Sequence, residues 1–208
     1  MLTRAVLLAA AATIASCFGA PTVPPAVTKC DMQTVSMNIV ASATINPTLE
    51  GEARPVQMRI YQLKDDVRLQ SADFEAVWKD DVKALATDII KRDELFVYPA
   101  TRTDLKFDRD PNALHVVGVA LFRNPKGRSW YVSFDLPPPP GKGDCRVPGC
   151  EGPDCGLNPN PKFAVWVDQT RVDDGGGHLD DVSDGRRIRV IQLTKPLAAP
   201  TAATTEAK

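Results

Sequence analysis

The sequence predicts a mainly β domain, a two-sheet β-sandwich with a short helical insertion. Residues 34–45 and 56–63 alternate between apolar and polar side chains, as half-buried strands do. Residues 71–90 instead place apolar side chains at helical spacing. Proline and glycine separate the remaining short apolar segments, and neither a repeating strand–helix pattern nor an internal repeat occurs.

The first two segments define a pair of strands joined by a polar loop. Val35, Met37 and Ile39 fall on one side of residues 34–45, and an Asn-Pro dipeptide ends that segment. The alternation resumes over residues 56–63. Two arrangements remain open for the pair, a long-looped hairpin or a crossing from one sheet to the other.

The middle of the chain supplies the helical insertion and the later part supplies more strands. Phe74, Val77 and Trp78 fall on one face of the first predicted helix, and Ser71 is expected to cap it. Residues 114–122 are almost continuously apolar and predict a central strand buried on both faces. Further strands are predicted at residues 94–98, 103–107, 129–136, 163–167 and 187–193.

The N-terminus has the pattern of an export signal. Arg4 precedes a ten-residue apolar run, Ala5–Ile14, which is too short to span a bilayer. Two small residues and Cys17 follow, and this order resembles the lipobox of bacterial lipoproteins, whose cysteine carries a diacylglycerol. Phe18 stands where the resemblance expects aspartate for inner-membrane retention, which favours the periplasmic face of the outer membrane. The alternative is a plain secretory signal that leaves Cys17 as a free thiol.

The chain therefore divides into four predicted parts. Residues 1–16 form a lipoprotein signal peptide and residues 17–29 a lipidated cysteine followed by a proline-rich tether. Residues 30–195 form the sandwich domain, with a Cys-rich loop at 137–161, and residues 196–208 a disordered tail. The 25 basic and 26 acidic residues balance, so the chain lacks the positive charge that nucleic-acid binding requires.

Four cysteines remain once the lipid anchor is set aside. An oxidising, exported context favours two disulfides over a four-thiolate zinc site. Three pairings are possible, and each of them joins the first cysteine to the Cys-rich loop. The four are Cys30, Cys145, Cys150 and Cys155.

Residues suited to catalysis are scarce. His115 begins the most apolar strand and is expected to be structural, and His178 lies in an acidic turn that could attract Ca²⁺ but lacks EF-hand spacing. No nucleophile, zinc-protease, phosphate-loop or dinucleotide motif occurs. We therefore expect no enzyme activity, no metal and no cofactor other than the acyl lipid on Cys17; a lipid-anchored hydrolase is the disfavoured alternative.

Several motifs together resemble the TssJ lipoproteins of bacterial type VI secretion systems. The resemblance covers residues 17–136 well and residues 163–193 more loosely. Its most specific part is the segment Pro-Val-Gln-Met-Arg-Ile-Tyr-Gln-Leu at 55–63 followed by the Asp-Phe helix. The lipobox, Asn46-Pro47, Gly51, Asp93-Glu94-Leu95 and Pro99 complete it.

The resemblance implies a transthyretin-like sandwich tethered to the inner leaflet of the outer membrane. It implies binding to the periplasmic C-terminal region of TssM and, indirectly, to TssL, within an envelope-spanning TssJ–TssL–TssM assembly. The alternative function is a solute- or carbohydrate-binding outer-membrane lipoprotein.

In the family the loop between the first two strands contacts TssM. Leu49, flanked by Glu50 and Glu52, is expected to act there as an apolar anchor with a polar rim; an ordinary solvated turn is the alternative. The predicted contact residues are Asn46, Pro47, Thr48, Leu49, Glu50, Gly51 and Glu52.

Overall fold

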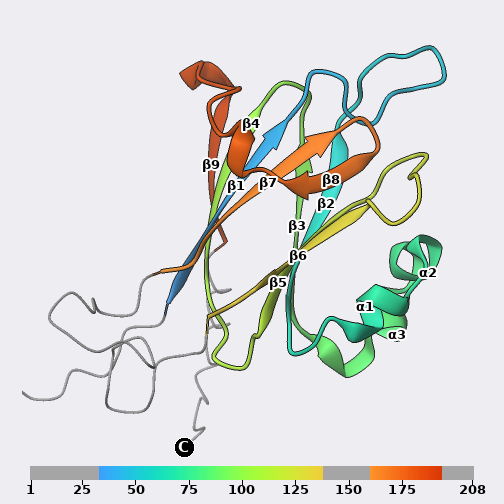
Figure 1. Ribbon diagram of the computed structural model, residues 1–208, viewed down its shortest axis with the longest axis vertical. Coiled ribbons are helices and arrows are strands. Elements are labelled where there is room, and N and C mark those ends of the chain that lie inside the picture. The colour runs from blue at the N-terminus through green and yellow to red at the C-terminus, as the bar shows by residue number, and fades with distance from the viewer. Residues whose placement is uncertain (1–32, 138–159, 194–208) are drawn as a thin grey trace, which may run out of the picture.

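Two β-sheets pack face to face in the computed structural model, which describes residues 33–137 and 160–193 (Figure 1). The five-stranded sheet has the order β8-β7-β1-β4-β9 and the four-stranded sheet the order β3-β2-β5-β6. The predicted two-sheet sandwich is confirmed. The strands are β1 Thr34–Ala41, β2 Val56–Leu63, β3 Ile89–Val97, β4 Arg102–Asp108, β5 His115–Ala120, β6 Tyr131–Asp135, β7 Lys162–Asp168, β8 Arg171–Asp174 and β9 Ile188–Leu193.

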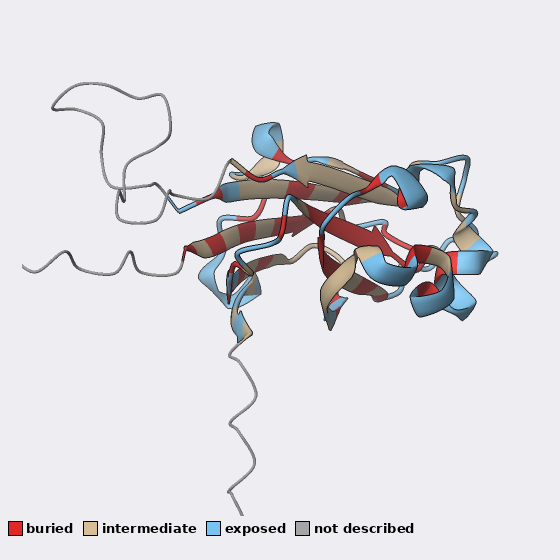
Figure 2. Cartoon of the chain, turned by 90° about the horizontal axis from the view of Figure 1, so that it is seen from below, coloured by how far each residue is buried: buried red, intermediate tan, exposed pale blue. Residues whose placement is uncertain are grey.

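β1 lies at the centre of the five-stranded sheet because its alternating side chains suit a half-buried strand. Val35, Met37 and Ile39 are fully buried between the sheets. Across the sheet Met37 pairs with Leu105 of the antiparallel β4 and with Phe163 of the parallel β7. Figure 2 shows the buried residues of the two layers facing each other. β1 ends at Ala41, before the predicted boundary, since residues 43–44 turn and Ile45 is the next buried residue.

The chain crosses from one sheet to the other between β1 and β2. β1 belongs to the five-stranded sheet, whereas β2 lies between β3 and β5 in the other. Of the two arrangements left open by the sequence, the crossing is therefore correct. The loop at residues 42–55 consequently bridges the two layers at one end of the sandwich (Figure 1).

The helical insertion follows β2 and packs beside the four-stranded sheet (Figure 1). Its apolar side chains Leu69, Val77 and Leu85 are fully buried in the same core as the strands. Helices this short are not stable by themselves, so tertiary packing stabilises them. The helical segments are α1 Val67–Ser71, α2 Phe74–Lys79, α3 Asp81–Leu85 and the 3-10 turn η1 Ala86–Asp88.

The insertion differs from the prediction in its start and its caps. It begins at Val67, and Ser71, the predicted N-cap, instead ends α1 and donates its hydroxyl to the Val67 carbonyl at 3.0 Å. The side chain of Asp80 caps α3 by accepting from the Lys83 N–H at 2.9 Å. The insertion also ends earlier than predicted, because β3 already starts at Ile89.

The acidic segment after β7, residues 171–181, is fixed to the sheet rather than fully solvated. Its first residues form β8, and the Gly175 N–H then donates to the Ala164 carbonyl of β7 at 3.0 Å. The His178 ring stacks on Trp166, with centroids 4.0 Å apart. Val182, which follows, is only 7% exposed. Backbone pairing and an aromatic contact, neither visible as an apolar pattern, therefore fix this segment to the sheet.

Candidate functional site

The predicted contact loop lies at the opposite end of the sandwich from the start of the domain (Figure 1). Gln33 immediately precedes β1, and the loop follows the end of that strand. The eight residues of β1 span roughly 26 Å at about 3.3 Å per residue. The segment that leads to Cys17 and the contact loop thus join the domain at opposite poles.

Asn46 forms the base of the loop rather than its surface. Its side chain donates from Nδ2 to the Pro55 carbonyl at 2.9 Å and accepts at Oδ1 from the Arg123 N–H at 2.9 Å. Its own N–H donates to the Gln169 carbonyl at 2.6 Å. Only 5% of Asn46 is exposed, so this predicted contact residue is placed inside the protein.

The tip of the loop is a tight turn held by its own backbone. The Thr48 N–H donates to the Glu52 carbonyl at 2.9 Å, and the Gly51 N–H donates to the Thr48 carbonyl at 3.1 Å. Gly51 has a φ of 85°, a conformation that glycine adopts at no steric cost. Arg54 forms an ion pair with Glu52 and donates its N–H to the Ile45 carbonyl at 3.1 Å. The tip is therefore preformed in the free protein.

Leu49 projects from this turn into solvent. It is 99% exposed, the highest value among the large apolar side chains of the described residues. Beside it, hydrogen bonds from the Glu50 backbone and the Thr48 side chain lower the pKa of the Glu50 carboxyl, so the group is anionic at neutral pH. Leu49 and Glu50 are thus both free to meet a partner, and the role of Leu49 as an anchor stays a prediction.

A shallow groove of about 680 Å³ lies next to the loop, between α2 and the β5–β6 connection. Arg123 and Arg128 line it together with the aromatic side chains of Phe74 and Trp130. Phe74 packs edge-on against Trp130 at 5.6 Å, and Trp130 is 2% exposed. The aromatic faces are thus used within the protein.

Trp78 contacts the other side of this pair, with its ring centroid 5.7 Å from that of Phe74, and Trp166 lies elsewhere. Trp78 is 43% exposed on α2, and Trp166 is stacked beneath His178. Stacking on a sugar ring needs an exposed aromatic face in a shared cavity. The three tryptophans do not form one, and this disfavours the carbohydrate-binding alternative.

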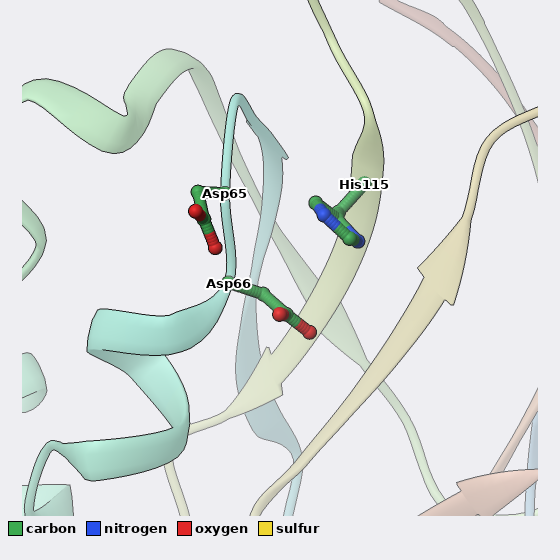
Figure 3. A group of neighbouring side chains, drawn as sticks. All are labelled: Asp65, Asp66 and His115. Atoms are coloured by element: carbon green, nitrogen blue, oxygen red, sulfur yellow. The ribbon is translucent and has the colours of Figure 1, made fainter. Parts of the chain in front are cut away.

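Asp65, Asp66 and His115 form the one group of potential metal ligands among the described residues (Figure 3), with ligand atoms within 4.8 Å of one another. Asp66 accepts hydrogen bonds from the Gln70 amide and the Ser133 hydroxyl, both at 2.8 Å. The His115 Nδ1 lies 3.0 Å from a carboxylate oxygen of Asp135 on β6. The Asp66 contacts join the start of α1 to β6, whereas the buried His115 Nδ1 makes no hydrogen bond in this group.

A buried arginine organises the pole where the domain starts. Arg109 is 3% exposed, and burial lowers its pKa. Its guanidinium donates to the Gln33 side chain at 2.6 Å, to the Pro137 carbonyl at 2.7 Å and to the Ala113 carbonyl at 2.9 Å. The Arg109 side chain therefore connects the start of the domain to the start of the Cys-rich loop.

The far end of that loop returns to the same place. The Thr34 N–H donates to the Asn160 side chain at 2.9 Å, and the Ser36 N–H donates to the Pro161 carbonyl at 2.9 Å. The predicted lipidation site and disulfide residues lie outside the described residues: Cys17, Cys30, Cys145, Cys150 and Cys155. The nearest described residues on either side of the loop nevertheless converge on the start of β1.

Two disulfides are expected in protein purified from the periplasm. The described residues on the two sides of the loop, Pro137 and Asn160, both lie near the start of β1. A disulfide from Cys30 to the loop is therefore expected to cost little additional chain entropy. Intact-mass measurement should show one hydrogen fewer for each of Cys30, Cys145, Cys150 and Cys155, and peptide mapping should link Cys30 to the loop. A Cys30→Ser variant should leave one loop cysteine alkylatable. Four free thiols, or bound zinc, would contradict this pairing.

The family model of the type VI secretion lipoproteins, described as VasD, EvfM and TssJ, matches residues 33–169. The chain belongs to the type VI secretion lipoprotein family. The predicted TssJ resemblance is confirmed, and the family is one of secretion-system lipoproteins rather than of enzymes. Among curated proteins, none matches the chain at a significant level. The described residues include no helix long and apolar enough to cross a membrane.

Solved structures share the fold of this family member. The lipoprotein TssJ1 of Pseudomonas aeruginosa is 18% identical, with a TM-score of 0.53 over 69% of this chain and 95% of that one. Serratia marcescens Lip, a membrane-bound secretion component, is 17% identical, with a TM-score of 0.56 over 72% and 99%. A chain from a structure described as the TssM C-terminal domain from EAEC is 22% identical, with a TM-score of 0.52 over 69% and 98%.

Proposed function

We propose that this family member is an outer-membrane-anchored periplasmic lipoprotein that binds the periplasmic C-terminal region of TssM through the exposed residues of the loop at 46–52. Binding there would tether a TssJ–TssL–TssM assembly to the membrane. The observation that carries the proposal is the 99% exposed Leu49 on a preformed turn. An apolar side chain held away from its own protein is suited to fill a pocket on a partner.

The two poles of the sandwich support the same function. A lipid on Cys17 would hold the domain through residues 17–29, which lead to the start of β1. The contact loop lies beyond the far end of β1, so it would be the part of the domain most distant from the lipid attachment. A molecule that links a membrane to a partner needs this separation of attachment points.

Replacing Leu49 with aspartate is expected to weaken binding to the purified periplasmic C-terminal region of TssM by about 100-fold or more, because a charge would enter the pocket that the leucine fills. Biolayer interferometry with immobilised TssM region measures the affinity. Circular dichroism should be unchanged, since Leu49 makes no buried contact.

The matched control is Val190→Asp on β9, because Val190 is also highly exposed, at 69%, but lies outside the loop. This variant should bind as the unmodified protein does. If Leu49→Asp retained full affinity, the loop would not be the contact and the proposal would fail.

A further inference from the structure

We propose that Asn46 is a positioning residue that sets the bound conformation of the contact loop before the partner arrives. The inference rests on the proposed function and deepens it, because it moves Asn46 from the contact surface to the support of that surface. Three features carry it: the backbone conformation of Asn46, its burial and the segments that it joins.

The backbone of Asn46, five residues after the end of β1, adopts a conformation that few residues tolerate. Its φ of 46° lies in the left-handed region, where asparagine is among the favoured non-glycine residues. Gln169, which accepts the Asn46 N–H at 2.6 Å, is also left-handed, with a φ of 40°. This hydrogen bond therefore joins the turn at Asn46 to the β7–β8 turn at Gln169.

The side chain of Asn46 joins the two ends of its own loop. Nδ2 donates to Pro55, the residue before β2, while the backbone of Asn46 starts the loop on the β1 side. A second bond at the base runs from the Arg54 N–H to the Ile45 carbonyl at 3.1 Å. The loop is thus closed at its base by one side chain and one backbone bond.

The same side chain also fixes the loop to its neighbours. Oδ1 accepts from the Arg123 N–H, where the β5–β6 connection begins, and the backbone N–H reaches the β7–β8 turn at Gln169. Each of these groups is a backbone group, so it cannot adjust by changing a side-chain rotamer. Asn46 therefore sets the position of the base relative to both sheets.

A fixed base beneath a self-bonded tip holds Leu49 in one place. Binding through a mobile loop lowers the apparent affinity, because only the fraction of molecules in the competent conformation binds. The exposed leucine has no contact that would hold it in position by itself. The hydrogen bonds made by Asn46 fix the base of the loop and so hold Leu49 in position indirectly.

The test uses Asn46→Gly, which permits the left-handed backbone but removes both side-chain bonds. With the purified periplasmic TssM region as the probe, affinity should fall about tenfold as the competent fraction falls. Hydrogen exchange at the amides of Thr48, Gly51 and Arg54 should accelerate, while exchange in the strands should not change. Asn46→Asp keeps the acceptor for Arg123 but loses the donor to Pro55, and its affinity should lie between the two.

A double-mutant cycle separates positioning from general destabilisation. If Asn46 acts through Leu49, then Asn46→Gly in a Leu49→Ala background should change affinity by no more than about twofold. Asn112→Gly, at a turn near the opposite pole, is the matched control and should bind normally.

Two results would overturn the role of Asn46: unchanged affinity in Asn46→Gly, or the same tenfold loss with and without Leu49. Failure of the proposed function is distinguishable from both. In that case Leu49→Asp itself would bind TssM normally, whatever the effect of Asn46→Gly.

Discussion

Replacing Gly175 with alanine is expected to reduce the free energy of unfolding by about 3 kcal/mol, since overpacking against a rigid neighbour is destabilising. An added Cβ would lie 2.5 Å from the Val165 carbonyl carbon and 2.8 Å from the Trp166 nitrogen. Both atoms belong to the backbone of β7, so the strand itself would have to shift. Urea denaturation followed by circular dichroism measures the loss.

Gly177, two residues further along the chain, provides the control for this variant. A Cβ on Gly177 would meet nothing within 4 Å, so Gly177→Ala should change stability by no more than about 0.5 kcal/mol. The acidic segment should also loosen in Gly175→Ala, and exchange at the His178 amide should rise. Equal stability of the two variants would mean that the segment does not approach β7 as closely as described.

Replacing Asp81 with alanine is expected to destabilise the protein by about 3 kcal/mol, because it leaves charged and polar partners without their acceptor. The Asp81 carboxylate accepts from the Tyr61 hydroxyl at 2.6 Å and from the Arg92 guanidinium at 2.9 Å. Its side chain is 5% exposed, whereas that of Arg92 is 42% exposed. Solvent around Arg92 keeps the expected effect at the lower end of the range for buried pairs.

Glu75→Ala is the matched control, since the Glu75–Lys79 ion pair lies on the surface of the same insertion with side chains 78% and 72% exposed. Its loss should change stability by no more than about 0.5 kcal/mol. Urea denaturation of both variants at neutral pH measures the difference. Similar stability of the two variants would show that the Asp81 network does not hold α3 on the sheet.

The Asp81 contribution should depend on pH in a defined direction. Burial raises the pKa of this carboxyl, but the hydrogen bonds from Tyr61 and Arg92 and the charges of Arg92 and Arg59 outweigh it, so the net pKa is lowered from 3.8. The stabilisation is therefore complete above that value and is lost as pH falls through the lower pKa of the folded state. The stability difference between the unmodified protein and Asp81→Ala should shrink only in that acidic range.

The strands were predictable wherever burial imposes a period on the side chains. β1 and β2 alternate because one face of each packs in the core, and the continuous apolar run of β5 marks a strand at the centre of its sheet. β8 was missed because backbone pairing with β7, and not an apolar pattern, forms it. The helix boundaries shifted because each helix is about one turn long and is ended by local capping.

The candidate site was predictable only in part, and through the family resemblance. The resemblance directed attention to the loop, and the structure adds that Leu49 is exposed there. The supporting bonds to Arg123 and Gln169 come from segments distant in the sequence, so no local pattern could reveal them. The Asn-Pro dipeptide does signal a turn, but it does not distinguish a side chain that meets a partner from one that holds the turn.

The position of β1 has a mechanical consequence. If the lipid pulls where the domain starts and the partner pulls at residues 46–52, the load runs along the axis of this strand. β1 is paired along most of its length with β4 on one side and β7 on the other, and its inter-strand hydrogen bonds lie across the strand direction. Such a load would shear many bonds together instead of opening them one at a time, so a domain pulled at these two points would resist the tension well.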